Sequence, residues 1–300
     1  MSDKVLAIVG PTASGKSELG VRLAKAFDGQ IISGDSIQVY RGFDIGSAKA
    51  AAAEMGGVRH HLIDTKDPTE PYNVCLFQTE GRQAITAIRR QGGLPLVVGG
   101  TGLYIKALLY DYTFTAMGAT DHDSYQGLPT DQLYQRLAAL DGPAAWKIGP
   151  ANRQRLVHAL AMAESGHLKS DQEAGQRHEM IYDAMVIGLT MPRALLVQRI
   201  DQRIDRMIAA GLEQEVRGLA GRYGWQIAGM KGIGYKEFQP YFEGRQTLAQ
   251  TVTDIKTHTR QFAKRQYTWW RHQLPVRWYD ITEPGYQDRI GQEVGTWLKD

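Results

Sequence analysis

A short stretch near the N-terminus carries the residue types that bind phosphate groups. The spacing G-x-x-x-x-G-K-[ST] is matched by Gly10, Pro11, Thr12, Ala13, Ser14, Gly15, Lys16 and Ser17. The two glycines let the backbone turn several N–H groups toward one point, and the lysine adds a positive charge beside them. The serine hydroxyl is a ligand for Mg²⁺. These groups predict a diphosphate-binding loop with a Mg²⁺ ion, and none of them recognises a base.

Two further side chains are candidates for chemistry beside this loop. Asp35 follows a second short apolar stretch, so we expect it at the edge of the sheet where the phosphate loop lies. There it is a candidate general base, and the alternative is that it caps its own turn through Ser33 or Ser36. Thr101 lies in a second glycine turn, where it either donates to a phosphate oxygen or caps the following helix.

An arginine stripe is the next candidate. Arg199, Arg203 and Arg206 lie at i, i+4 and i+7 in a helix predicted for residues 192–219. An arginine in this position can bind a diphosphate with two parallel hydrogen bonds. The spacing favours the alternative, a solvated face paired with Asp201, Asp205 and Glu213.

The acid that nucleotide-hydrolysing proteins use for Mg²⁺ is missing. In those proteins the acid follows an apolar strand. Here the apolar residues 96–98 are followed by Gly99, Gly100, Thr101 and Gly102. This disfavours an ATPase or GTPase and favours a transfer reaction in which the phosphate is substrate or leaving group.

The C-terminal part contains a basic run without acids, from Ile255 to Trp278. Its polar side chains and two nearby lysines suit a nucleic-acid backbone: Arg260, Lys264, Arg265, Gln266, Arg271, Lys231 and Lys236. Tyr267, Trp269 and Trp270 are available for stacking on bases. The alternative is a basic solvated helix face, with the tryptophans in the core.

The elements that must position these residues follow from hydrophobic periodicity. Residues 5–9 form an unbroken apolar run, typical of a buried parallel strand, and residues 18–27 repeat apolar positions at helical spacing. Strand, turn and helix then alternate as far as residue 110, with a short strand expected at 60–64, which predicts a doubly wound parallel sheet. Residues 115–129 are small and polar without periodicity. They are followed by two predicted helices, 130–140 with Thr130 as N-cap and 152–165, before a strand returns at 182–189.

We therefore expect an α/β protein with a P-loop NTPase-like parallel sheet core, formed by residues 1–112 and 182–300, and a helical insertion domain, residues 113–181. The formal net charge of +3 is too small to indicate a partner by itself. The single cysteine, Cys75, excludes an internal disulfide. No apolar run reaches the roughly 18 residues of a membrane span, and we expect a cytoplasmic protein.

Taken together, the motifs resemble those of the tRNA dimethylallyltransferases, also called tRNA isopentenyltransferases. The matching segments occur in the family's order over nearly the whole chain: GPTASGKS at 10–17, SGDSIQVYRGFDIGSAK at 33–49, HHLID at 60–64, GGTGLY at 99–104, QRIDQRIDRMIAAGLEQEV at 198–216, KGIGYKE at 231–237 and TRQFAKRQYTWWR at 259–271. The resemblance implies transfer of a dimethylallyl group from dimethylallyl diphosphate to N6 of the adenosine 3′ of the tRNA anticodon. It also implies that the phosphate loop holds this diphosphate rather than ATP.

The resemblance further implies residue roles. Asp35 would take the N6 proton, Lys16, Thr101 and Arg203 would act on the diphosphate, and Ser17 would serve Mg²⁺. The anticodon stem-loop would meet Asp35, Ser36, Ile37, Gln38, Thr101, Gln154, Arg155, His158, Lys231, Gly232, Gly234, Tyr235, Lys236, Arg260, Lys264 and Arg265. In the insertion, His158 and Ala161 stand where the family has arginine and glutamate. A monomer is expected.

Three alternatives remain open at this stage. A P-loop small-molecule kinase would consume ATP, and a non-enzymatic RNA-binding protein would leave the prenyl diphosphate unchanged. An isopentenyltransferase acting on free adenine nucleotides would use the same loop. The acid-free basic run favours RNA over a free nucleotide.

Overall fold

A computed structural model describes residues 4–114, 123–125, 127–175 and 179–300. The backbone divides into two compact units: unit 1 comprises Met1–Leu109 and Met180–Asp300, and unit 2 comprises Tyr110–Glu179. The predicted boundaries are 112–113 and 181–182. Most of the aperiodic stretch 115–129, namely residues 115–122 and 126, lies outside the described residues.

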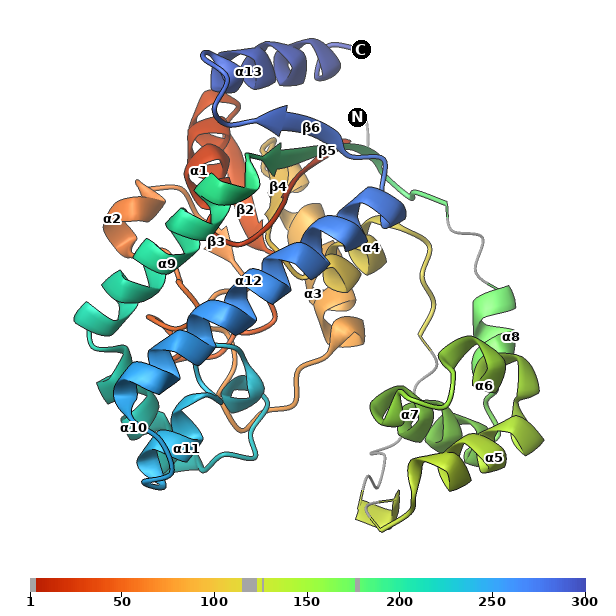
Figure 1. The fold of residues 1–300 in the computed structure, drawn as a ribbon. Coiled ribbons are helices and arrows are strands. Elements are labelled where there is room, and N and C mark those ends of the chain that lie inside the picture. Colours follow the sequence, from red (N-terminus) through yellow and green to blue (C-terminus); the bar gives the residue numbers. More distant parts are fainter. Residues whose placement is uncertain (1–3, 115–122, 126, 176–178) are drawn as a thin grey trace. The chain divides into compact units, whose positions relative to one another are not determined.

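Unit 1 is built on a six-stranded sheet in which every neighbouring pair is parallel. The strands are β1 (Lys4–Val9), β2 (Gly29–Ser33), β3 (His60–His61), β4 (Leu94–Val98), β5 (Asp183–Thr190) and β6 (Arg277–Asp280), in the order β3-β2-β4-β1-β5-β6. The α/β class with a parallel sheet is confirmed (Figure 1). Ile8 of β1 is in register with Val98 on one side and Ile187 on the other. Because helices cover both faces, residues 5–9 are fully buried and read as a continuous apolar run.

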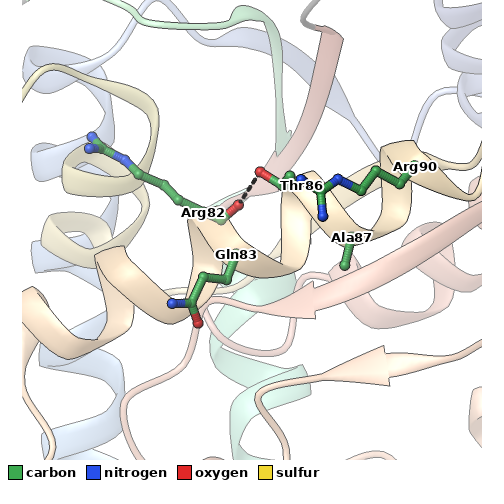
Figure 2. A pocket seen from close by; sticks show the side chains of 5 residues that line it. All are labelled: Arg82, Gln83, Thr86, Ala87 and Arg90. Carbon is green, nitrogen blue, oxygen red and sulfur yellow. Dashed lines mark hydrogen bonds between the residues drawn. The ribbon is translucent and has the colours of Figure 1, made fainter.

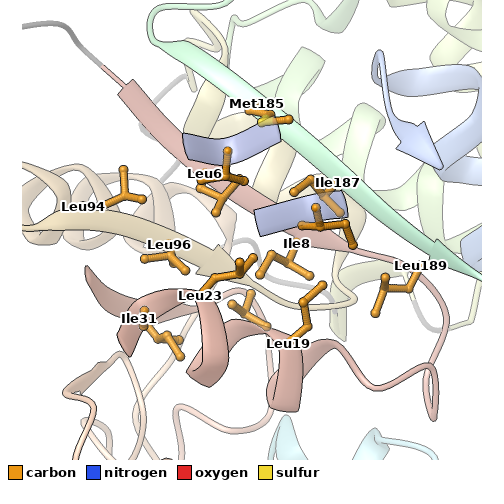
Figure 3. Packing of buried hydrophobic residues seen from close by; sticks show 14 of the residues in the cluster. Leu6, Ile8, Leu19, Leu23, Ile31, Leu94, Leu96, Met185, Ile187 and Leu189 are labelled. Carbon is orange, nitrogen blue, oxygen red and sulfur yellow. The ribbon is translucent and has the colours of Figure 1, made fainter. Parts of the chain in front are cut away.

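Two hydrophobic cores among the described residues hold many of the helices of unit 1. In the first, side chains of β1, β4 and β5 pack against α1 (Lys16–Ala26) and α13 (Tyr286–Trp297), as Figure 3 shows for Leu6, Ile8, Leu19 and Leu23. The second core joins α9 (Arg193–Ala209), α10 (Leu212–Tyr223), α11 (Phe238–Phe242) and α12 (Leu248–Gln273) with the loop that follows β2. The 3₁₀ turn Gly229–Lys231 adds Met230 to the second core, and the other helices of unit 1 are α2 (Ala52–Met55), α3 (Val74–Arg90) and α4 (Gly102–Leu109).

Unit 2 has its own core. Its helices are α5 (Thr130–Leu140), α6 (Gly142–Ile148), α7 (Arg153–Glu164) and α8 (Lys169–Ala174), with a 3₁₀ turn at Asp123–Tyr125. Apolar side chains of α5 and α7, among them Leu133, Leu137, Leu156 and Leu160, form the centre. The carboxylate of Asp141 accepts hydrogen bonds from the N–H groups of Ala144 at 3.2 Å and Ser170 at 3.0 Å, and so links the starts of α6 and α8.

Three element predictions are wrong in detail. The helix predicted for residues 192–219 is two helices, because Gly211 adopts φ +99° and turns the chain between α9 and α10. Thr130 lies inside α5, and Pro129 takes the N-cap position. The strand predicted for residues 60–64 is only His60–His61, since Leu62 and Asp64 have positive φ. The helices α2, α6, α8, α11 and α13 are additions that periodicity did not predict.

Candidate functional site

The predicted phosphate loop connects β1 to α1. Gly10 has φ +139°, and a Cβ there would lie 2.9 Å from the carbonyl oxygen of Leu189, so a side chain does not fit. Gly15 is the N-cap of α1, with φ +92°. The hydroxyl of Ser14 is buried and has no hydrogen-bond partner among the described residues. An unpaired buried hydroxyl in a loop that leads into a helix N-terminus fits an anionic ligand such as a phosphate.

Lys16 folds back over the loop. Its Nζ donates a hydrogen bond of 2.6 Å to the carbonyl oxygen of Pro11. Desolvation, followed by the positive charge of Arg203, lowers its pKa to about 7, and the charge of Asp35 opposes this shift. A diphosphate would supply the negative charge that favours the protonated lysine.

Asp35 lies at the end of β2 in the same charge cluster. Desolvation raises the pKa of its carboxyl group, while hydrogen bonds from two backbone N–H groups and the charges of Lys16 and Arg203 lower it. Oδ1 accepts these bonds from Ile37 at 2.8 Å and Gln38 at 3.4 Å. One oxygen of Asp35 therefore caps its own turn, through Ile37 and Gln38 rather than through Ser33 or Ser36 as the alternative proposed. Oδ2 accepts no hydrogen bond from the described residues, which leaves it available as a proton acceptor.

The second glycine turn packs directly against the loop after β2. A Cβ on Gly99 would lie 2.3 Å from the carbonyl oxygen of Gly34, so the two backbones touch. The N–H of Thr101 donates to Gly34 at 3.2 Å, and the Thr101 hydroxyl accepts from the N–H of Ser36 at 3.2 Å. Because this hydroxyl is used as an acceptor, its hydrogen is free to be donated to a ligand.

The three arginines predicted to form one stripe on α9 have different surroundings. Arg199 donates from Nε to the carbonyl oxygen of Ala13 in the phosphate loop, at 2.9 Å. Arg203 is part of the charge cluster: desolvation lowers its pKa, while the charge of Asp35 raises it. Arg206 is exposed.

The predicted pairing of this stripe with three acids is wrong. Those acids have other partners: Asp201 pairs with Arg260, Asp205 with Lys256 at 2.6 Å, and Glu213 with Arg217 at 2.8 Å. The first two pairs join α9 to α12, whereas Arg199 contacts the phosphate loop and Arg203 acts on the charge of Lys16.

The inner face of α12 is structural. Gln266 is buried and bridges two turns: its Oε1 accepts from the N–H of Thr12 at 2.9 Å, and its Nε2 donates to the carbonyl oxygen of Gly100 at 3.0 Å. Trp270 is fully buried, and the Tyr267 hydroxyl donates to Thr190 at 2.7 Å. The expectation that Gln266 suits an RNA backbone is therefore wrong, and Trp270 is a core anchor.

The outer face of α12 carries a surface hollow of about 590 Å³. It is lined by Gln261, Lys264, Arg265, Thr268, Trp269, His272 and Gln273. Lys264 and Arg265 are exposed and form no ion pair with the described residues. Arg260 differs, because both of its guanidinium ends are bound to Asp201, with Nε at 3.0 Å from Oδ1. This face presents cations beside an aromatic ring.

The loop at residues 231–236 lies against the loop after β2. A Cβ on Gly232 would be 3.5 Å from the side chain of Ile37. Lys231 and Lys236 are exposed, whereas Gly234 is buried and Tyr235 is 1 % exposed. Gln38 is occupied within its own loop, where Nε2 donates to Ser47 at 3.2 Å and Ala48 at 3.3 Å. The lysines face solvent, and the other side chains fix the loops.

In unit 2, the three candidates from the insertion lie on one helix. Gln154, Arg155 and His158 are exposed residues of α7, whose N-cap is Asn152. The buried side of the same helix, with Leu156 and Leu160, faces the unit's core.

A second hollow, of about 410 Å³, lies on α3 (Figure 2). It is lined by Arg82, Gln83, Thr86, Ala87 and Arg90, all from this one helix. None of the predicted site residues lines it, so it does not bear on the phosphate site.

The described residues contain no group of three or more His, Cys, Asp or Glu side chains placed to hold a metal ion. A Mg²⁺ ion that is shared with a substrate diphosphate needs only one or two protein ligands. Ser17, exposed in the first turn of α1, fits that requirement. None of the helices in the described part of the chain has the length and apolar character of a membrane span.

Comparisons with known proteins agree with the geometry. Residues 38–273 match the family model described as IPP transferase, and residues 3–70 match the one described as isopentenyl transferase. The tRNA dimethylallyltransferase of Geobacillus kaustophilus is 45 % identical over 307 residues, covering 99 % of this chain and 97 % of that protein.

Solved structures give the same result. The full-length tRNA isopentenylpyrophosphate transferase of Bacillus halodurans has a TM-score of 0.77 and 38 % identity, over 99 % of this chain and 97 % of that one. A eukaryotic dimethylallyltransferase acting on tRNA has a TM-score of 0.84 and 28 % identity, over 98 % of this chain and 78 % of that one. The site geometry and these similarities lead to one conclusion: the chain belongs to the tRNA dimethylallyltransferase family.

Proposed function

We propose that this enzyme transfers a dimethylallyl group from dimethylallyl diphosphate to N6 of the adenosine 3′-adjacent to the tRNA anticodon and releases diphosphate. One observation carries the proposal. The carboxylate of Asp35, the ammonium group of Lys16 and the guanidinium group of Arg203 act on one another's charge beside a phosphate loop that contains an unpaired buried hydroxyl. A base and anion-binding groups together suit a transfer in which a nucleophile loses a proton and a diphosphate leaves.

The reaction requires three events around one carbon atom. The N6 nitrogen forms a bond to the allylic carbon, the bond from that carbon to the diphosphate oxygen breaks, and the N6 proton goes to Oδ2 of Asp35. The negative charge that grows on the diphosphate is stabilised by the loop N–H groups, Lys16 and Arg203. The Thr101 hydroxyl, already held by the N–H of Ser36, donates its hydrogen to the diphosphate.

Mg²⁺ is the cofactor that we propose, with Ser17 as its protein ligand; when bound, it neutralises charge on the diphosphate. The tRNA contacts that we propose are made by the half-buried residues 35–38, by the exposed Lys231 and Lys236, and by the exposed Lys264 and Arg265 on α12. The exposed residues of α7 contact the same tRNA. The enzyme acts as a monomer in the cytoplasm.

The test is transfer of labelled dimethylallyl groups to an unmodified tRNA, with and without ATP. We expect product without ATP, loss of turnover in EDTA, and no transfer to AMP. A strict ATP requirement would favour a kinase-like reaction, and transfer to AMP but not to tRNA would favour the free-nucleotide enzyme. Binding of tRNA with dimethylallyl diphosphate left intact would indicate a non-enzymatic RNA-binding protein.

A further inference from the structure

Glu215 of α10 makes a set of contacts that the transfer chemistry does not use. Its Oε2 accepts from the backbone N–H groups of Asp44 at 3.2 Å and Ile45 at 2.7 Å, and its Oε1 accepts from Gly46 at 3.1 Å. Oε1 also accepts from the hydroxyl of Tyr235 at 2.8 Å. One carboxylate thus binds three consecutive backbone donors and a buried side chain, which is the way a protein holds an anion in a concave turn.

These donors belong to two different loops, and both loops carry proposed tRNA contacts. Asp44, Ile45 and Gly46 lie in the loop after β2, which also contains Asp35. Tyr235 lies in the loop at residues 231–236. The loops also touch directly: the rings of Phe43 and Tyr235 are 4.9 Å apart, and a Cβ on Gly46 would lie 2.5 Å from the Tyr235 ring. Glu215 therefore binds both loops.

Hydrogen bonds within the loop after β2, together with its backbone, connect the residues held by Glu215 to the proposed base. The Ser47 hydroxyl donates to the carbonyl oxygen of Phe43 at 2.6 Å, and the Gln38 amide donates to the carbonyl oxygens of Ser47 and Ala48. The N–H of Gln38 in turn donates to Oδ1 of Asp35 at 3.4 Å. A shift of the loop residues that Glu215 binds would therefore also shift the turn that orients Asp35.

The charge of Glu215 is needed as well as its shape. All four partners are donors, and a carboxylate offers two acceptor oxygens to them. An amide would keep one acceptor but turn an NH₂ group toward other donors, which leaves part of this set of donors, in a partly buried turn, without its acceptor. Hydrogen bonds to a charged acceptor are also stronger than neutral ones.

We propose that Glu215 is a positioning residue for the transfer reaction. It holds the loop of Asp35 and the loop of Tyr235 in one arrangement before tRNA arrives. The inference rests on the proposed function and adds to it a residue that touches neither substrate. Loops that are ordered in advance lose less conformational entropy when the RNA docks, so the effect is expected on tRNA rather than on diphosphate.

The chain offers a matched control two residues away. Glu213 is on the same helix and equally half-buried, but it binds Arg217 at 2.8 Å and the Tyr241 hydroxyl at 3.3 Å instead of the two loops. Glu213→Gln removes the same charge from α10. Tyr235→Phe is a milder probe, since it removes one hydroxyl and keeps the ring in the core.

The experiment measures three quantities for each full-length variant: the Kd of unmodified tRNA, the Kd of inorganic pyrophosphate, and the single-turnover rate at saturating tRNA. For Glu215→Gln we expect tRNA binding to weaken about tenfold to a hundredfold, and the single-turnover rate to fall about fivefold. Pyrophosphate binding should stay within about twofold. Tyr235→Phe should give a smaller loss of tRNA binding and of rate. Glu213→Gln should have the same affinities and the same rate as the protein without substitutions.

Two results would overturn the inference while the unmodified protein remains an active prenyltransferase. One is tRNA binding and turnover in Glu215→Gln and Tyr235→Phe equal to those of Glu213→Gln. The other is a parallel loss of pyrophosphate and tRNA binding, which would make Glu215 a general stabiliser of the fold. If the unmodified protein binds tRNA but does not prenylate it, the proposed function fails, and the tRNA affinities still decide the role of Glu215.

Discussion

Two sets of basic side chains, both predicted to bind anions, lie in contrasting surroundings. Lys16 and Arg203 lie half-buried beside Asp35, and desolvation lowers the pKa of Lys16 to about 7. Lys264 and Arg265 stand exposed on α12. In the first set, desolvation and neighbouring charges alter the chemistry of each group, so single changes should have large and specific effects. In the second set, the attraction depends on how many positive charges the face carries, and salt screens each of them. Single substitutions there should therefore have small and additive effects on binding.

The largest effect is expected at Asp35. Asp35→Asn keeps the shape and the acceptor that caps the turn but removes the carboxylate, so single-turnover prenyl transfer should fall by about 10²–10⁴. The affinity for tRNA should change little. Asp288→Asn, at an exposed position of α13, is the control. Transfer at a near-normal rate in Asp35→Asn would show that Asp35 only caps its turn and is not the base.

The next effect concerns pH. The free protein loses the Lys16 proton as pH rises through about 7, whereas a bound diphosphate favours the protonated form. Pyrophosphate affinity should therefore be greatest below pH 7 and fall by up to about tenfold per pH unit above it. Titration of the ligand itself is common to all variants, so Lys16→Arg, which stays charged, corrects for it. Parallel pH profiles for both proteins would contradict a lowered Lys16 pKa.

The two faces of α12 allow the comparison within a single helix. Gln266→Glu places a negative charge next to the phosphate loop, and we expect about tenfold weaker pyrophosphate binding with little change for tRNA. Gln261→Glu adds the same charge on the outer face, where it should weaken tRNA binding and leave pyrophosphate unaffected. Isothermal titration with each ligand measures both. Equal effects of the two variants on pyrophosphate would remove the distinction between the faces.

The smallest effect is expected on the outer face itself. Lys264→Gln or Arg265→Gln should weaken every tRNA by about threefold to fivefold at moderate salt. Each change should also lower the slope of log K against log salt by about 0.7–0.9, and the double variant by twice that. Affinity measured from low to high salt checks this, and an unchanged slope would indicate a face that is merely solvated.

The contrast also explains what the sequence predicts and what it does not. The phosphate loop, β1 and α1 were predictable because they are local: apolar run, glycine turn and helix follow one another along the chain. The end of α9 was also predictable, because residues 209–211 are Ala-Ala-Gly and a glycine commonly follows the end of a helix. The prediction missed it because it used hydrophobic periodicity alone.

The roles of Arg199, Gln266 and Glu215 were not predictable in this way. Each acts on a segment far away in the sequence: Arg199 on Ala13, Gln266 on Thr12, and Glu215 on residues 44–46. A basic run likewise does not say which of its members turn inward. That choice is made by acids on a neighbouring helix, here Asp201 and Asp205 of α9.

The order of the strands has a consequence for the protein during its synthesis. β1 lies between β4 and β5, and β5 is translated only after all of unit 2. Until residues 183–190 leave the ribosome, β1 keeps one open edge, the kind of strand edge that pairs wrongly with other chains. A nascent chain that stops at residue 179 already contains the whole phosphate-loop motif, Asp35 and Thr101. It lacks the carbonyl of Leu189 against which Gly10 packs, and it should aggregate rather than bind pyrophosphate.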